Sequence, residues 1–254
     1  LERVKLLGVK PERWPLFPSG LAILYGIFLQ LKIESMVYSE GALREGLIYD
    51  LLGRHEPENI QNRTLTALEQ RYSIPTGQAE RVRATALYLF DQLKPNWPDT
   101  NTAYFQQMLE NAAQLHEIGL SISHSQFHKH GGYIIEHSDL AGFSKHDQQM
   151  LSCLIRLHRR KINLAVLELL EPGQRPIAFR LIVILRLSVA LNHCRDFQPA
   201  ALCKAIRVES KITSVNRLAV TFTKGWLEQH PLVQADLEVE RQALERTGFN
   251  LEVV

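Results

Sequence analysis

The residues with the clearest chemical potential are a histidine and a glutamate that stand next to each other, His116 and Glu117, in the segment Leu115–Gly119. Histidines are concentrated around and after this pair, because seven of the ten in the chain fall between His116 and His158. Imidazole nitrogens and carboxylate oxygens are the usual ligands of the divalent metals that activate water for hydrolysis. The segment therefore raises the question of whether this region holds a catalytic metal.

The elements that would position these residues form a helical middle zone, from about residue 55 to 196. One apolar stripe at 3–4 residue spacing runs from Ala79 to Leu93, with Thr76 as the expected N-cap. A second stripe, Tyr104, Met108, Ala112 and Leu115, predicts a helix that delivers His116 and Glu117 to its C-terminal end. A third face combines Leu151, Leu154, Ile155 and His158, and the segment 177–191 is apolar all round, which predicts a central buried helix.

The zones on either side have different patterns. Before the helical zone we expect an apolar helix at about 19–31, a short strand at 33–38 and a helix that carries Leu43, Leu47 and Leu51. After it, the period changes to that of strands at 205–209, 217–223 and 250–254, with a helix at about 225–246. The last zone is therefore expected to be a small α/β domain.

The pair His116–Glu117 resembles the signature of the HD metal-dependent phosphohydrolases, with glutamate in place of aspartate. That family takes a further histidine from an earlier helix and an aspartate from a late helix, and the matching positions here hold Gln78 and Val189. An amide is a poor metal ligand and an isopropyl group is none. We therefore expect a degenerate site without metal, although a rearranged site of His116, His130 and His158 stays open as an alternative. Otherwise these histidines are hydrogen-bonded core or surface residues, and Glu117 pairs with Arg159 or Arg186.

Composition narrows the class of protein. The net charge of +2 is too small to indicate a nucleic-acid partner by itself. The three cysteines, Cys153, Cys194 and Cys203, form no paired motif, which favours reduced thiols and a cytoplasmic location. Polar residues interrupt each apolar run before it reaches about 20 residues, so no membrane span is expected. The chain begins at Leu1 rather than methionine, and we expect that an N-terminal part is missing.

The first zone makes a second resemblance specific. The segments 17–24 and 39–46, the second of which contains Ala-Leu-Arg-Glu-Gly, are similar to the end of the actin-like half of the exopolyphosphatase / guanosine pentaphosphate phosphatase family. Segments 89–93, 115–119 and 157–161 fit the same family, so the resemblance covers essentially the whole chain. It implies a mainly α fold: the end of an actin-like (ribonuclease H-like) domain at 1–53, an HD-like helical domain at 54–198 and a small α/β domain at 199–254.

The resemblance also implies a function. In this family the actin-like domains remove a terminal phosphate from polyphosphate or guanosine pentaphosphate with a divalent metal, usually Mg²⁺. Those catalytic groups would precede Leu1, so no catalytic residue and no cofactor is expected in this chain. The C-terminal part extends a channel for long inorganic polyphosphate and contributes to a homodimer.

Basic residues suit such a channel. Arg156 and Arg160 are spaced to share a helix face and are flanked by Arg159 and Lys161, while His128, Lys129 and His130 form a second cluster. Like charges at this spacing repel mildly, and a polyanion would relieve that repulsion. Arginine binds phosphate oxygens in a bidentate manner, whereas lysine acts as a point charge. A solvent-exposed basic face is the simpler explanation of either cluster.

Three functions remain open from the sequence. The favoured one is the polyphosphate-binding, dimerising C-terminal region of an exopolyphosphatase-like or guanosine pentaphosphate phosphatase-like enzyme, inactive alone. The second is an active HD-type metal-dependent phosphohydrolase with a rearranged histidine site. The third is an interaction domain that dimerises and does not bind polyphosphate.

Overall fold

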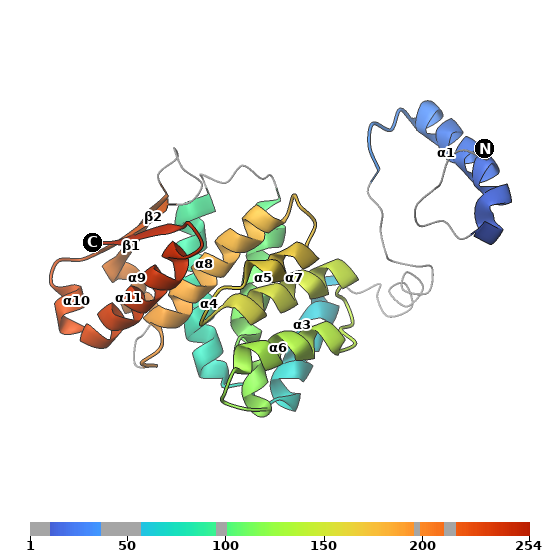
Figure 1. Ribbon diagram of the computed structural model, residues 1–254. Helices are drawn as coiled ribbons and strands as arrows, with labels where there is room; N and C mark the ends of the chain where they lie inside the picture. The colour runs from blue at the N-terminus through green and yellow to red at the C-terminus, as the bar shows by residue number, and fades with distance from the viewer. Residues whose placement is uncertain (1–10, 37–56, 95–100, 196–198, 211–216) are drawn as a thin grey trace. The chain divides into compact units, whose positions relative to one another are not determined.

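The computed structural model describes residues 11–36, 57–94, 101–195, 199–210 and 217–254. Its contacts divide the chain into two units, Leu1–Gly41 and Ala42–Val254. The described residues are mainly helical, as the sequence predicts, and a small sheet lies in the second unit (Figure 1). The helical zone and the C-terminal α/β zone of the sequence belong to this second unit together.

The first unit confirms the predicted apolar helix. A 3-10 turn, η1 (Pro11–Leu16), leads into α1 (Phe17–Leu31), and α1 ends at Lys32, whose left-handed backbone (φ 51°) lets its N–H bond to Phe28 O. The strand expected at 33–38 is wrong for residues 33–36, which form no strand. Residues 37–38 and the helix expected around Leu43, Leu47 and Leu51 lie outside the described residues.

The helical stretch Glu12–Leu31 is the single candidate for a membrane span among the described residues, by length and composition alone. None of its side chains is buried, and large apolar ones such as Leu21, Ile23 and Leu29 are exposed. The core helix of a soluble protein satisfies the same criteria. The stretch therefore does not establish a membrane location.

The second unit begins with helices that follow one another closely in the chain. In order they are α3 (Pro57–Arg71), α4 (Thr76–Leu93), α5 (Thr102–Leu115), the 3-10 turn η3 (Ile118–Ser121), α6 (Phe127–His137), α7 (Lys145–Leu157), the 3-10 turn η4 (Leu164–Leu169) and α8 (Arg175–Leu191). The predicted stripes on α4, α5 and α7 are buried, apart from Tyr104 of α5, which is partly buried. One boundary differs, since the N-cap of α4 is Pro75 and Thr76 is already helical.

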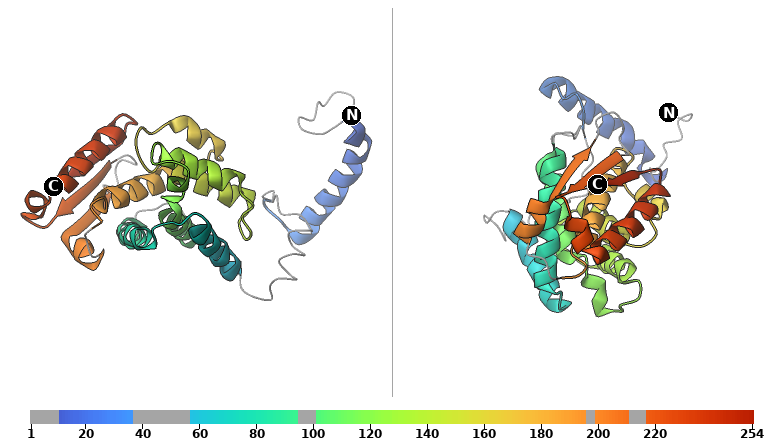
Figure 2. Two further views of the ribbon diagram at one scale, coloured as in Figure 1. Left: turned by 90° about the horizontal axis from the view of Figure 1, so that it is seen from below. Right: turned by 90° about the vertical axis from the view of Figure 1, so that its left-hand side faces the viewer.

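Helix α8 is the centre of the second unit, as its uniform apolarity predicts. Its residues from Leu181 to Ser188 are all buried, because α8 packs against α4, α5 and α7 on one side and against α11 (Pro231–Glu245) on the other. Figures 1 and 2 show α8 running from the helical region towards the sheet, with α11 beside it. The side chains of residues 181–188 are therefore held between the helical and the α/β parts.

The α/β part contains α9 (Pro199–Ala205), β1 (Ile206–Ser210), β2 (Arg217–Phe222), α10 (Trp226–Gln229), α11 and β3 (Asn250–Val253). The strands lie in the order β1-β2-β3, with β1 antiparallel and β3 parallel to β2. All three strands fall within one residue of their predicted bounds. The helix predicted at 225–246 is instead broken at His230, because Pro231 lacks an N–H and starts a new helix.

Side chains of α4 occupy the outer edge of β1. The Tyr88 hydroxyl donates to Ile206 O at 3.0 Å, and Val208 N donates to Gln92 Oε1 at 2.9 Å. An unpaired strand edge is a template for pairing with another chain, and these bonds satisfy part of that edge. They also fix the sheet against the helical part of the unit.

The turn after the His116–Glu117 pair packs against α6 at backbone distance. A Cβ added at Gly119 would lie 2.0 Å from Phe127 O and 2.5 Å from Gly131 N, so only glycine allows this contact. Since both neighbours are backbone atoms, neither can rotate away. This close approach sets the position of η3 relative to the N-terminus of α6.

Gly119→Ala should therefore destabilise the chain by about 3 kcal/mol or more, at the upper end of the cost of overpacking. The free energy of unfolding from chemical denaturation measures this change. Gly173→Ala is the matched control, because its added Cβ would meet nothing within 4 Å. An equal stability for the two variants would contradict the close packing of η3 on α6.

Candidate functional site

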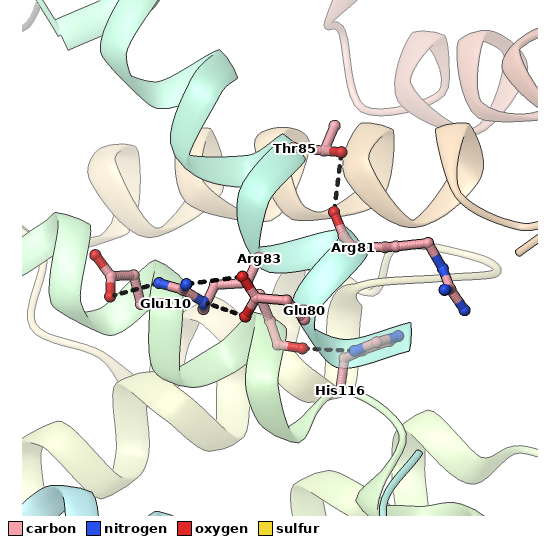
Figure 3. Close-up of polar contacts among 7 residues, drawn as sticks. Glu80, Arg81, Arg83, Thr85, Glu110 and His116 are labelled. Carbon is pink, nitrogen blue, oxygen red and sulfur yellow. Dashed lines mark hydrogen bonds and ion pairs between the residues drawn. The ribbon is translucent and has the colours of Figure 1, made fainter. Parts of the chain in front are cut away.

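The predicted His116–Glu117 pair lies immediately after the last turn of α5, and both side chains are buried. The Nδ1 atom of His116 is 2.7 Å from Ala113 O, so this nitrogen carries the proton and donates to the carbonyl. Figure 3 shows the ring in this position at the end of α5. The same view shows Arg83 of α4 between Glu80 and Glu110, an ion-pair network that joins α4 to α5.

The two positions that depart from the HD pattern have structural roles. Gln78 is buried and uses both ends of its amide, since Nε2 donates to Asn192 O at 2.9 Å and Oε1 accepts from Arg81 Nε at 3.1 Å. Val189 on α8 is half-buried and packs against the core. Gln78 thus joins α4 to the residue after α8, and neither position supplies a metal ligand.

The structure brings together three of the histidines. The rings of His116 and His158 are perpendicular, with centroids 5.6 Å apart, and the ring of His128 lies 6.3 Å from that of His158. The histidine near His158 is therefore His128, not the His130 of the rearranged metal site considered from sequence. In the part of the chain that the structure describes, no three His, Cys, Asp or Glu side chains are placed to hold a metal ion.

The three clustered histidines are neutral at physiological pH. Burial lowers the pKa of His116 to about 4, and burial together with the nearby positive charge of Arg159 lowers the pKa of His128 to about 4. Burial and the neighbouring His116 place the pKa of His158 well below its ordinary value. His158 also donates from Nδ1 to Ile155 O at 2.6 Å, so Nε2 of this ring, like that of His116, is a hydrogen-bond acceptor.

Glu117 pairs with Arg195, not with Arg159 or Arg186 as expected from sequence. Arg195 Nη2 lies 2.6 Å from Glu117 Oε1, while Glu117 Oε2 is buried and has no hydrogen-bond partner among the described residues. The two expected partners make other contacts: Arg186 pairs with Glu240, and the Arg159 guanidinium lies over the Phe127 ring, 4.5 Å from its centroid. Burial raises the pKa of Glu117, and the charges of Arg195 and Arg159 oppose that shift.

These residues line a cavity of about 830 Å³, here called the histidine cavity. Its lining includes the buried residues His116, Glu117 and His158 and the apolar side chains of Phe127, Val189 and Ala243. Cations line it in excess over carboxylates. The cations are Arg159, Arg160, Lys161, Arg186, Arg195 and Arg246, and the carboxylates are Glu117, Asp236 and Glu240. The contribution of α11 to this cavity was not predicted, since no local pattern in the sequence connects residues 236–247 with His116.

Three of these cations, Arg159, Arg160 and Lys161, form a short basic loop after α7. Arg159 is half-buried, whereas Arg160 and Lys161 are exposed. Burial lowers the pKa of Arg159, and the adjacent charge of Arg160 adds to this effect. Arg160 has a left-handed backbone (φ 62°), which is uncommon for a residue with a Cβ.

Arg186 explains how this loop is held. Its side chain is fully buried, and it donates to Leu157 O and Arg160 O at 2.7 Å each and to Glu240 Oε2 at 2.6 Å. The first two bonds satisfy carbonyls at and beyond the C-terminus of α7, which a helix leaves without partners. Arg186 therefore connects α8, the basic loop and α11 through one guanidinium group.

Arg156 does not belong to the basic loop, contrary to the expected spacing on one helix face. Helix α7 ends at Leu157, so Arg156 and Arg160 no longer share a helical face. Arg156 instead lies 3.2 Å from Glu136 of α6 and lines neither of the cavities that the basic loop lines. Its charge is therefore partly neutralised on another side of the unit.

A second cavity, of about 690 Å³ and here called the α6 cavity, shares the basic loop with the histidine cavity. It is lined by the loop, by His128 and Lys129, and by residues 124–126 before α6. Gln126, the N-cap of α6, makes no side-chain cap, so the first N–H groups of this helix favour an anion nearby. Of the predicted cluster at 128–130, His128 and Lys129 line this cavity and His130 lines neither cavity.

The buried histidines predict an acid-sensitive fold. The pKa of His116 is 6.5 in the unfolded chain, its ordinary value, and about 4 in the folded chain. At pH values between these two, the unfolded chain binds more protons than the folded chain does. The stability due to a neutral His116 is thus complete above pH 6.5 and is lost as the pH falls towards 4. On going from pH 7 to pH 5, the parent should lose about 2 kcal/mol more unfolding free energy than His116→Gln does.

Glu117 and Glu240 change the pH dependence of stability in the direction opposite to that of His116, because burial raises the pKa of each carboxyl. Their contribution is common to both chains and largely cancels in the comparison of parent with variant. His137→Gln, the same substitution at an exposed position, is the control for the change of side chain. If parent and His116→Gln lost the same stability between pH 7 and 5, His116 would not be neutral in the fold.

Comparison with known proteins connects this site to a family. Residues 60–241 match the family described as Ppx/GppA phosphatase, domain III, and residues 1–55 match the Ppx/GppA phosphatase family. The first match contains the histidine cavity residues up to 241, the α6 cavity and the basic loop. The second match, residues 1–55, contains helix α1 with its exposed apolar surface.

Two similar curated proteins support the same assignment. A guanosine-5'-triphosphate,3'-diphosphate pyrophosphatase of Aeromonas salmonicida (strain A449) is 38% identical over 249 residues, which are 98% of this chain and 49% of that protein. A protein of the same name from Aeromonas hydrophila subsp. hydrophila is 39% identical over 246 residues, 95% of this chain and 48% of that protein. The chain spans about half the length of these relatives. By its matches over nearly the whole of its length, the chain belongs to the Ppx/GppA phosphatase family.

Proposed function

We propose that this chain is the C-terminal region of a longer phosphohydrolase that releases a terminal phosphate from guanosine pentaphosphate or polyphosphate. In this proposal the chain binds the extended phosphate chain, and the hydrolytic centre lies in actin-like domains outside it. The names of the relatives, which refer to guanosine-5'-triphosphate,3'-diphosphate, favour guanosine pentaphosphate as a substrate of the whole protein. Long inorganic polyphosphate remains the ligand that best matches the extent of the basic surface.

The observation that carries the proposal is the position of the basic loop between two cavities. Arg159, Arg160 and Lys161 line both the histidine cavity and the α6 cavity. Three adjacent cations on a shared wall give a continuous positive surface from one cavity to the other. A linear polyanion would contact both sides of the loop at once.

The energetics of the loop also favour an anionic ligand. The lowered pKa of Arg159 shows that its charge is destabilised by burial and by the adjacent Arg160. A phosphate oxygen between the two guanidinium groups would offset both effects with charge-assisted hydrogen bonds. The Arg159 side chain is already oriented by stacking on Phe127, and the backbone of Arg160 is held by Arg186, so binding requires less ordering of the loop.

Other properties of the whole protein are part of the same proposal. Residues 1–53 would complete an actin-like domain, 54–198 would form an HD-like domain without its metal, and the full-length enzyme would use Mg²⁺ in the missing half. Homodimerisation and a cytoplasmic location follow from the family resemblance. Hydrolysis at a rearranged HD site is not favoured, because His128 and not His130 lies beside His158, and the described residues contain no group of three His, Cys, Asp or Glu side chains placed to hold a metal ion.

Replacing the basic loop should weaken phosphate-chain binding. The triple variant Arg159→Ala, Arg160→Ala, Lys161→Ala should bind long polyphosphate at least about tenfold more weakly than the parent, since each lost phosphate contact removes counterion release. Titration calorimetry of the purified chain at several salt concentrations measures the affinity and its salt dependence. The slope of log affinity against log salt should become shallower in the variant.

The control variant removes the same three side-chain types elsewhere: Arg63→Ala, Arg207→Ala, Lys224→Ala, all at exposed positions outside both cavities. This control lowers the net charge by the same amount as the basic-loop variant does. A difference in affinity between the two variants therefore reports the position of the removed charges and not the overall charge. Equal losses of affinity in the two triple variants would show that binding depends on net charge alone. Such a result would remove the basic loop from the proposed function.

A further inference from the structure

The four positions that match the metal ligands of the HD pattern are all connected to one arginine, Arg195. Glu117 holds the guanidinium directly, because Arg195 Nη2 donates to Glu117 Oε1 at 2.6 Å. His116 lies within range of the same charge, since burial lowers the pKa of its ring and the positive charge of Arg195 adds to that effect. Two of the four positions therefore act on the Arg195 side chain or are affected by it.

The other two positions hold the backbone that carries Arg195. The N–H of Arg195 donates to Asn192 O at 3.1 Å, and the same carbonyl accepts from Gln78 Nε2 at 2.9 Å. Asn192 N in turn donates to Val189 O at 3.2 Å. These bonds fix the turn after α8, and Arg195 stands in it with a left-handed backbone (φ 59°) that is uncommon for a residue with a Cβ.

These positions suit a guanidinium group better than a metal ion. The amide of Gln78 is bonded at both ends, and the isopropyl group of Val189 has no ligand atom. Glu117 supplies a carboxylate, and Arg195 meets its charge. A metal ion needs several such ligands, whereas one carboxylate is enough to hold an arginine.

Arg195 keeps hydrogen-bond donors for a ligand. Its side chain is 47% exposed and lines the histidine cavity, together with Arg159 and Arg160 of the basic loop. A guanidinium has five N–H donors, and the Nε and Nη1 groups of Arg195 make no hydrogen bond to the residues that the structure describes. Arg186 is the opposite case, because it is fully buried and its three nitrogens are bonded within the fold.

We propose that Arg195 is a further phosphate-binding residue of the histidine cavity and that Glu117 positions it, so that a guanidinium group takes the place of the metal ion of the HD pattern. The phosphate ligand rests on the proposed function, whereas the pairing of Arg195 with Glu117 does not. Arginine binds phosphate oxygens through two N–H groups at once, and a carboxylate behind it fixes the direction of this fork. Glu117 is a positioning residue, because its side chain is 8% exposed and its negative charge would repel phosphate.

Calorimetry of the purified chain with long polyphosphate, in EDTA and at several salt concentrations, tests the role of Arg195. Arg195→Ala should weaken binding at least about tenfold, because a charge-assisted hydrogen bond is lost. The slope of log affinity against log salt should become shallower by about 0.7, the value for one phosphate contact in single-stranded nucleic acid. Arg207→Ala, at an exposed position outside both cavities, is the matched control and should leave affinity and slope nearly unchanged.

A double-mutant cycle tests the positioning by Glu117. Glu117→Asp keeps the charge but shortens the side chain by one methylene group, so it should weaken binding at least about threefold in the parent and leave binding unchanged in the Arg195→Ala background. A role of Glu117 in folding or in the overall field of the cavity would give equal effects in both backgrounds. The unfolding midpoint identifies a misfolded variant, and Glu117→Gln and Arg195→Gln then complete the same cycle.

Three results would overturn the inference. Arg195→Ala could bind polyphosphate as tightly as Arg207→Ala does, which would leave the basic loop as the phosphate-binding surface without Arg195. Equal effects of Glu117→Asp with and without Arg195 would remove the positioning role. Binding that is lost in EDTA and restored by Mg²⁺ would show that a metal ion, not a guanidinium group, holds the phosphate. If the parent chain did not bind long polyphosphate at all, the proposed function would be wrong together with this inference.

Discussion

A buried positive charge, the guanidinium of Arg186, is the interaction on which the arrangement of the second unit depends. Removing such a charge from water is costly, and attraction to a carboxylate offsets that cost only if the remaining donors are also bonded. Arg186 meets this condition through Glu240 and through the carbonyls of Leu157 and Arg160. These contacts fix the C-terminal end of α7 and the position of α11 relative to the central helix α8.

This constraint makes the α/β part essential to the helical part. If α11 were displaced, Arg186 would lose its counter-charge while staying inside an apolar helix. The bonds of Tyr88 and Gln92 to β1 also hold the two parts together, since they join α4 to the sheet. The helical and α/β zones that the sequence separates by period are thus one unit in packing, and the histidine cavity is formed by both of them.

The sequence predicted the parts of the structure that depend on local pattern. Periodic stripes located α4, α5 and α7, uniform apolarity located α8, and alternation located the three strands. The site was less predictable because its geometry depends on distant contacts. Arg156 and Arg160 have helical spacing, but bonds from Arg186 end α7 between them; similarly, Glu117 pairs with Arg195, which lies 78 positions later. Two arginines, Arg180 and Arg186, interrupt the apolar pattern of residues 177–191, and they were the available signal that a cation has a special role in this helix.

The left-handed backbone at Arg160 has a consequence for how this family could diverge. Arg186 holds this residue through its carbonyl oxygen, so the path of the loop does not require the Arg160 side chain. Glycine or asparagine adopts such a backbone more readily than arginine does. The charge could therefore be lost during evolution while the loop keeps its shape. Relatives that prefer different polyanions could then have the same loop backbone and differ only in the side chain at this position.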